Sequence, residues 1–432
     1  MTNDAAVLRG TDVAAVNSKW RVLTASLAGT TIEFFDFYIY LQATVLVFPK
    51  LFFPASDPLT QQLASFATFA VAFFTRPIGS ALFGHFGDRV GRKATLVAAL
   101  LTMGISTIVI GFLPTYAQIG IAAPVLLTLC RVGQGLGLGG EWGGAILLAT
   151  ENAPPGQRAW YGMFPQLGAP LGFTLSSGIF LVLSDVLSDG QFLSFGWRIP
   201  FLLSALLVVV GLYVRLKIAE TPAFRRTLEN DERVHVPIGN VFAQHGRALL
   251  LGVFACVATF VLFYLLVGFT PSWGIGQLKY PKVQFLIMQI VAMVFFAVGI
   301  VISAWWAKDH GARRMLVIAT VLIIAFGFLF KPMLVADSAG LVLAFMSLGL
   351  FLMGLTYGPL GTAMAELFPT AVRYTGSSLA FNIGGLSASL TPFFATSLAS
   401  GHGVVAVGWY LAGAALLTLL ALLAMKPGNI HD

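Results

Sequence analysis

Long apolar runs, separated by polar breaks, dominate the sequence. They predict twelve membrane-spanning helices, near residues 22–47, 61–84, 94–113, 119–149, 158–182, 197–214, 248–271, 283–306, 315–332, 339–364, 374–397 and 403–425. A helix needs roughly 20 mainly apolar residues to cross the hydrocarbon core of a bilayer, and most of these runs approach or exceed that length. We therefore expect an all-α membrane protein.

One charged segment divides the runs into two groups of six. The breaks are short except between the sixth and seventh runs, where a charged linker lies. The expected organisation is a polar tail, a six-helix bundle, the linker, a second six-helix bundle and a second tail, with bounds of 1–21, 22–216, 217–247, 248–425 and 426–432.

Lysine and arginine residues are distributed unevenly over the breaks. The two tails, the linker and the breaks expected on the same side contain 18 of them, whereas the other side contains only Lys50, Arg198, Lys279, Lys282 and Lys331. Cytoplasmic loops of membrane proteins are enriched in Lys and Arg. Both termini and the linker are therefore expected to face the cytoplasm.

An internal repeat supports the division into halves. The pattern Glu151-x-x-Pro154-x-x-x-Arg158 recurs from Glu366 to Arg373, at an offset of 215 residues in a chain of 432. Two like-oriented six-helix halves with a substrate site between them are an architecture of secondary transporters.

Composition narrows the class of protein further. Hydrophobic residues make up 57% of the chain and charged residues 10%, against about 25% charged in soluble proteins, so a soluble enzyme and a nucleic-acid binder are excluded. The six histidines are scattered, Cys130 and Cys256 lie in apolar runs, and no phosphate-binding loop is present. We expect no metal, no cofactor and no ATP-driven step, so transport draws on a gradient or runs downhill.

The break between the second and third runs contains the glycine-rich and charged sequence GDRVGRK, residues 87–93. It predicts a tight turn in which a carboxylate accepts hydrogen bonds from a neighbouring helix end. A weaker copy of the sequence begins at Asp309, so one conformational latch in each half is expected, although the basic residues could instead serve only as topology anchors. The candidate latch residues are Gly87, Asp88, Arg89, Gly91, Arg92 and Asp309.

GDRVGRK between the second and third of twelve spans resembles the loop signature of the major facilitator superfamily. Further similar segments are IEFFDFYIY (32–40), FATFAVAFFTRPIGSALFGHFGDRVGRK (66–93), RVGQGLGLGGEWGGAILLATENAP (131–154), GWRIPF (196–201), ETPAF (220–224) and ELFPTAVRYTG (366–376). Together they resemble the metabolite:proton symporter branch, whose members include permeases for shikimate, 2-oxoglutarate, citrate and proline/betaine. The resemblance implies the two-bundle fold of the superfamily and proton-coupled transport by alternating access.

Charged residues inside the predicted spans are the candidates for proton coupling, because an ionisable group at membrane depth is costly. Glu33 and Asp36 lie three residues apart and are expected on one face of the first span. Arg131, Gln134 and Glu141 are expected to form a polar stripe on the fourth span. The pattern Arg131-x-x-Gln134-Gly resembles the proton-coupling motif of the superfamily. The alternative for both groups is a fixed ion pair between helices, and Arg131 could pair with Asp36 or with an anionic substrate.

Polar residues in other spans are candidates for the substrate site. Arg76 precedes Pro77, which favours a kink near a cavity. The full set of candidates is Arg76, Arg131, Gln134, Gln166, Tyr264, Gln289, Tyr357 and Asn382, of which those in the second half could equally satisfy a neighbouring helix.

The sequence thus predicts a monomeric proton-coupled symporter in a bacterial inner membrane. Two buried cations, Arg76 and Arg131, favour a small organic acid as the substrate. A zwitterionic osmolyte such as proline or betaine is the alternative substrate class, and a proton-independent facilitator is the alternative mechanism. Small molecule, protons and membrane lipid are the expected partners, and nucleic acid is not.

Overall fold

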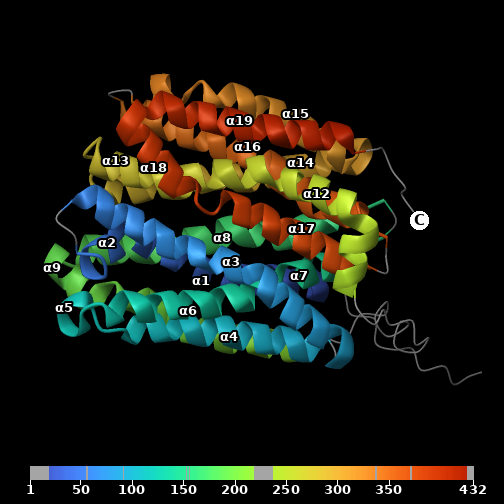
Figure 1. The fold of residues 1–432 in the computed structure, drawn as a ribbon, viewed down its shortest axis with the longest axis horizontal. Helices are drawn as coiled ribbons and strands as arrows, with labels where there is room; N and C mark the ends of the chain where they lie inside the picture. The colour runs from blue at the N-terminus through green and yellow to red at the C-terminus, as the bar shows by residue number, and fades with distance from the viewer. Residues whose placement is uncertain are drawn as a thin grey trace, which may run out of the picture.

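The computed structural model describes residues 19–54, 57–90, 92–151, 153–154, 156–217, 237–335, 338–369 and 372–425. These residues are almost entirely helical, and the long helices run in alternating directions along the long axis of the molecule, which is horizontal in Figure 1. The helices of the first half, blue to green, lie below those of the second half, yellow to red, in this view.

The first half runs from Lys19 to Lys217. Its helices are α1 (Lys19–Leu46), α2 (Phe48–Leu51), α3 (Pro58–Val90), α4 (Arg92–Phe112), α5 (Tyr116–Ile119), α6 (Ala122–Gly139), α7 (Trp142–Glu151), α8 (Arg158–Val186), α9 (Asp189–Gln191), the π-helix η1 (Phe192–Gly196) and α10 (Arg198–Lys217).

The second half begins at Pro237. Its helices are α12 (Pro237–Tyr264), η2 (Leu265–Phe269), α13 (Thr270–Gly276), α14 (Lys282–His310), α15 (Ala312–Gly327), η3 (Phe330–Leu334), α16 (Ala339–Glu366), α17 (Arg373–Ala388), α18 (Thr391–His402) and α19 (Val404–Ala424).

The described helices make twelve passes along the long axis, six in each half, once the consecutive short helices are joined. Seven of the passes, or eight with the bent pair at Asp189–Gly196 and Arg198–Val214, are long and apolar enough by length and composition alone to cross a membrane. The remaining passes are shorter, interrupted or more polar: α15 has 16 residues, and α1 carries Glu33 and Asp36. The fold confirms the predicted all-α membrane architecture of two six-helix bundles.

Two ends of the molecule are used below as reference points. The end at which α1 begins and α19 finishes is called the termini end, and the end that carries α5 and α9 is called the opposite end (Figure 1).

The linker expected at residues 217–247 is partly helical. Helix α12 begins at Pro237 and continues through a kink at His245, where φ is −121° and ψ is 20°. Residues 218–236 and the expected tails before Lys19 and after Met425 lie outside the described residues.

Glycine brings α3 and α6 unusually close together. A Cβ atom added at Gly135 would lie 1.9 Å from Oγ1 of Thr75, and one added at Gly139 would lie 2.1 Å from the carbonyl oxygen of Arg76. No side chain fits at such distances, so the glycines of the fourth span allow the close helix packing that membrane helices obtain from small residues. This contact fixes the position of Arg76 relative to α6.

Candidate substrate and proton site

A small cavity lies between the two bundles at the middle of the long helices. Its volume is about 30 Å³, which is room for about two water molecules. Both halves contribute to its wall, which consists of Glu33, Phe34, Phe37, Tyr38, Arg76, Leu138, Trp142, Ala169, Phe260, Phe263, Tyr264, Met353, Tyr357, Phe381 and Asn382. This volume is smaller than a metabolite, so the cavity does not hold one in this conformation.

Arg76 is the cation of this cavity. Helix α3 places it one residue before Pro77, and its side chain is only 7% exposed. The guanidinium lies over the rings of Phe73 and Phe37, with Cζ 4.8 and 5.4 Å from the ring centroids. Its Nε has no hydrogen-bond partner within the described part of the chain. Because a buried donor without a partner is costly, Arg76 is poised to bind an anionic group of a ligand.

One carboxylate and several aromatic rings share the cavity with Arg76. Glu33 is buried on α1, and three tyrosines, Tyr38, Tyr264 and Tyr357, line the wall. The tyrosines combine an apolar face with a hydroxyl group that can donate or accept a hydrogen bond. The cavity can therefore bind a small polar molecule that presents both a charge and an apolar surface.

Arg131 is buried beside the cavity and does not belong to its wall in this conformation, so its role in substrate binding stays a prediction. Its Nε donates to the carbonyl of Phe69 at 3.2 Å, and its Nη1 donates to Oε1 of Gln134 at 2.9 Å. The guanidinium carbon lies 4.1 Å from the ring centroid of Tyr40. Aromatic faces and polar groups surround this cation, so the predicted ion pair with Asp36 is not present in this conformation.

Asp36 points away from the cavity into the first bundle. It is fully buried, and Oγ of Ser204 on α10 donates to its Oδ1 at 2.6 Å. Thr107 lies beside the carboxyl group, but Oδ2 has no hydrogen-bond partner among the described residues. Glu33 and Asp36 therefore have different surroundings, although a spacing of three residues leaves them only about 60° apart around the helix axis. The packing of the neighbouring helices makes the difference.

A chain of polar side chains connects Arg131 to the surroundings of Asp36. Arg131 donates to Gln134, whose Nε2 donates to Oγ1 of Thr107 at 2.8 Å. Thr107 lies next to Asp36. The two predicted proton-coupling residues are thus linked through Gln134 and Thr107 instead of touching each other. Gln134 belongs to this chain and does not line the cavity.

The predicted stripe on the fourth span is interrupted. Helix α6 ends at Gly139 and α7 begins at Trp142, so Glu141 lies in the break and not at the next turn of one continuous helix. Glycines at 139 and 140 reduce helix propensity at this point. Glu141 is buried there.

Several other predicted substrate residues join the two halves. Nε2 of Gln166 on α8 donates to the carbonyl of Tyr357 on α16 at 2.8 Å. Nδ2 of Asn382 on α17 donates to Oγ of Ser80 on α3 at 2.9 Å. Tyr357 and Asn382 also line the cavity, as does Tyr264, whereas Gln166 and Gln289 do not. Gln289 is buried on α14 with its Nε2 unpartnered among the described residues.

Among the cavity residues that the sequence interpretation missed are Tyr38, Trp142 and Phe381. Tyr38 stands five residues after Glu33 in an aromatic segment, and Trp142 follows directly after Glu141. Aromatic residues are frequent in the apolar spans of this chain, so nothing local distinguishes these three from residues that face lipid.

The predicted latch lies largely outside the described residues. Gly91 lies outside the described residues, and only the backbone of Gly87, Asp88, Arg89 and Arg92 is described. In the weaker copy, Asp309 is exposed at the end of α14. The neighbouring Arg313 donates to the carbonyls of Leu422 and Leu423 at 2.7 and 3.1 Å, so it caps the end of α19 within its own half.

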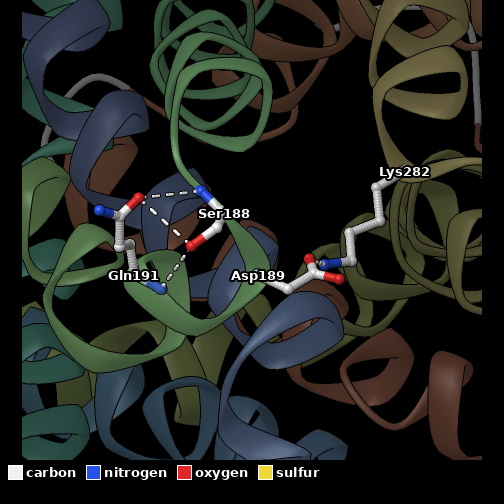
Figure 2. A network of polar contacts seen from close by, with 4 residues as sticks. All are labelled: Ser188, Asp189, Gln191 and Lys282. Carbon is white, nitrogen blue, oxygen red and sulfur yellow. Dashed lines mark hydrogen bonds and ion pairs between the residues drawn. The ribbon is translucent and has the colours of Figure 1, made fainter.

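The opposite end carries an ion pair between the halves, shown in Figure 2. Nζ of Lys282, the first residue of α14, lies 2.6 Å from Oδ1 of Asp189 in the first half. A capping box between Ser188 and Gln191 fixes the turn that carries Asp189. The hydrogen bond and the charge of Lys282 hold the pKa of Asp189 below its ordinary value.

Two six-helix bundles with a small cavity between them at mid-height are typical of a multi-pass membrane transporter. Residues 27–392 match the family model of the Major Facilitator Superfamily, so the chain belongs to this family, whose members are transporters and not enzymes. The inner membrane metabolite transport protein YhjE of Escherichia coli is 54% identical over 94% of both chains. A shikimate transporter of the same organism is 33% identical over 95% of both chains.

The fold also matches solved structures. The xylose transporter XylE from E. coli, in a partially occluded inward open conformation, superposes with a TM-score of 0.76 at 17% identity, over 96% of this chain and 99% of that one. At this identity the match concerns the fold alone. The protein is a Major Facilitator Superfamily transporter of metabolites.

Proposed function

We propose that the protein is a proton-coupled symporter that imports a small organic acid across the bacterial inner membrane. The observation that carries this proposal is Arg76, a buried guanidinium with an unpartnered Nε in the wall of the cavity between the bundles. A carboxylate in the cavity would supply the missing acceptor and compensate the buried charge. The similarity to a shikimate transporter, whose name specifies a carboxylic acid, supports this substrate class.

Asp36 is the proposed proton carrier, with Glu33 in the cavity as its assistant. Asp36 is fully buried, and no described residue forms an ion pair with it. An isolated carboxylate in such a position is costly, whereas a protonated carboxyl group needs only ordinary hydrogen bonds. We therefore assign the protonated form to Asp36 in this conformation.

Arg131 is the proposed link between the proton and the substrate sites. Its side chain reaches Gln134 on one side, and its Tyr40 and Phe69 neighbours belong to the aromatic packing around the cavity. When Asp36 loses its proton, the new negative charge attracts Arg131 through the gap that Gln134 and Thr107 now bridge. This rearrangement couples deprotonation to movement within the first bundle.

The proposed orientation of the protein in the membrane follows from the distribution of lysine and arginine. The termini end is assigned to the cytoplasm, because the breaks expected on that side contain most of the basic residues. Transporters of this family typically work as monomers, and we propose the same state here. Membrane lipid surrounds the exposed apolar faces of the bundles.

A zwitterion is a second candidate substrate, and one observation favours it. Glu33 lines the same cavity as Arg76, together with the rings of Trp142, Tyr264 and Phe260. Aromatic faces attract quaternary ammonium groups, and a carboxylate adds to that attraction. Such a wall fits a molecule with a carboxylate at one end and a cationic ammonium group at the other.

Uptake into proteoliposomes with imposed pH and potential gradients tests the function. The panel contains labelled shikimate, dicarboxylates, citrate, proline and betaine. Arg76→Gln is expected to weaken the affinity for the transported acid by roughly 10- to 100-fold, which corresponds to the loss of one or more hydrogen bonds to a charged group. Arg76→Lys keeps the charge but loses the forked donor geometry, so its affinity for the acid should lie between those of the parent and of Arg76→Gln.

A matched pair of competitors separates the two substrate classes. Glycine betaine and 3,3-dimethylbutyrate have the same shape and carboxylate, but only glycine betaine carries a quaternary ammonium group. Stronger competition by glycine betaine would favour the zwitterion, and equal or stronger competition by 3,3-dimethylbutyrate would favour the acid. Uptake of a substrate at full rate by Arg76→Gln would contradict the role of Arg76.

A further inference from the structure

The fourth membrane pass is broken beside the cavity. Helix α6 ends at Gly139 and α7 begins at Trp142. Leu138 and Trp142, one on each side of the break, both line the cavity. A change at the break therefore moves part of the cavity wall.

Trp142 is connected to the second half in two ways, one direct and one through Gln166. Its indole stacks face to face on the ring of Phe381, with centroids 3.5 Å apart and an interplanar angle of 8°. Its Nε1 donates to Oε1 of Gln166 at 3.3 Å, and Gln166 in turn donates to the carbonyl of Tyr357. Phe381 and Tyr357 belong to the second half, so both routes join the two bundles through this one side chain.

A third connection ends on the backbone of the break itself. Asn382, next to Phe381, donates to Oγ of Ser80, and Ser80 donates to the carbonyl of Gly139 at 2.5 Å. Gly139 also packs directly against the carbonyl of Arg76, with no space for a Cβ atom. The break is thus tied to the opposite bundle on one side and to the backbone of the cavity cation on the other.

These contacts form a layer between the cavity and the termini end. Trp142 lies nine residues before the end of α7 at Glu151, and Phe381 lies eight residues after the start of α17 at Arg373. At a rise of 1.5 Å per residue, the stack lies about 12 to 14 Å from that end of the helices. Trp142 and Phe381 thus belong to the part of the cavity wall that lies towards the termini end.

We propose that the Trp142–Phe381 stack, with the Ser80–Asn382 hydrogen bond, is the gate at the termini end, and that it opens when α7 swings about the break at Gly139 and Gly140. A glycine pair at a helix interruption is a recognised site of bending. The proposal rests on alternating access, which is part of the proposed function, but it requires no particular substrate or proton carrier. Static packing of a buried aromatic pair is the competing explanation.

Labelling of a cysteine inside the cavity distinguishes a gate from static packing. Ala169 lines the cavity and is replaced by cysteine in a background in which Cys130 is serine and Cys256 is alanine. A membrane-impermeant thiol reagent is applied to the termini end, in vesicles of known orientation, without substrate or gradient. Trp142→Ala is expected to accelerate labelling roughly three- to tenfold, the change in open population that follows from losing one aromatic pair.

Two further variants serve as controls. Trp142→Phe keeps a ring that can stack on Phe381, so its labelling rate should stay near that of the parent. Trp160→Ala removes a half-buried tryptophan at the termini end of α8, outside the proposed gate, and should have no effect. If Trp142→Ala labels no faster than Trp160→Ala, or labels equally faster from both ends, the gate proposal is wrong.

A reversible cross-link covers the case in which Trp142→Ala does not fold. Ser80→Cys and Asn382→Cys introduce thiols where the side chains are 2.9 Å apart. Oxidation should stop both labelling at position 169 from the termini end and transport, and a reductant should restore both. Undiminished labelling after complete cross-linking would overturn the proposal. Failure to transport any acid with normal gating of label would instead count against the proposed function alone.

Discussion

The hydroxyl group of Ser204 donates a 2.6 Å hydrogen bond to the carboxyl group of Asp36, and this contact joins α10 to α1 deep inside the first bundle. Asp36 is thereby oriented away from the cavity and towards Thr107 and Gln134. The proposed proton carrier and the proposed substrate cation, Arg76, are therefore separate sites. Their separation allows mutations to affect one function without the other.

Asp36→Asn should abolish uphill uptake and retain counterflow, because a permanently neutral side chain mimics the protonated state. Ser204→Ala should keep uphill uptake but shift the pH dependence of the uptake rate, since it removes one hydrogen bond from the carboxyl group. Ser204→Thr, which keeps the hydroxyl group, is the control. The measurements are uptake and exchange in proteoliposomes at a series of pH values. Uphill uptake by Asp36→Asn at the parental level would remove Asp36 from the mechanism.

Arg131→Gln should reduce both uphill uptake and exchange, because it empties a fully buried cation site between Tyr40 and Gln134. The affinity for substrate should change less than in Arg76→Gln, since Arg131 does not line the cavity. Equilibrium binding to the purified protein separates the two variants. Equal losses of affinity would show that Arg131 reaches the substrate in another conformation.

The ion pair between Asp189 and Lys282 should stabilise closure of the opposite end. The pKa of Asp189 is lowered by Lys282, so the stabilisation is present above the ordinary pKa of a carboxyl group and is lost as the pH falls from there through the lowered pKa. Asp189→Asn should leave the pH profile of uptake near neutrality unchanged. Since Asp189 is exposed, opening of the opposite end should increase by less than about fivefold.

Charge reversal tests this ion pair more directly than removal. Asp189→Lys alone should increase access of a thiol reagent to the cavity from the opposite end, and the double variant Asp189→Lys with Lys282→Asp should restore the parental rate. Labelling of Ala169→Cys measures both. An equal effect in the single and double variants would exclude the pair as a stabilising contact.

The orientation of the protein in the membrane is tested with two exposed positions. Arg314 lies at the termini end and Ala117 at the opposite end. A cysteine replacing Ala117 should react with an impermeant maleimide in intact cells, and one replacing Arg314 should react only after the cells are opened. The reverse pattern would invert the assigned topology.

The sequence by itself determined the architecture. A bilayer admits only helices or closed barrels, so the apolar runs had to be helices of membrane length. The repeat and the loop sequence GDRVGRK then indicated two like halves and the superfamily. The sequence also identified Arg76, Glu33 and Tyr357 as candidate site residues, because charged and polar groups inside apolar runs stand out against their neighbours.

Only the tertiary structure decided how these groups meet. Spacing along α1 could not show that Glu33 faces the cavity while Asp36 faces Ser204, since that depends on which helices pack on each side. The break after Gly139 and the stack of Trp142 on Phe381 were equally invisible, because the two aromatic residues lie in different halves of the chain and resemble the many that face lipid. Contacts between residues distant in sequence arise from packing of the two bundles, and no local pattern of hydrophobic and polar positions specifies them.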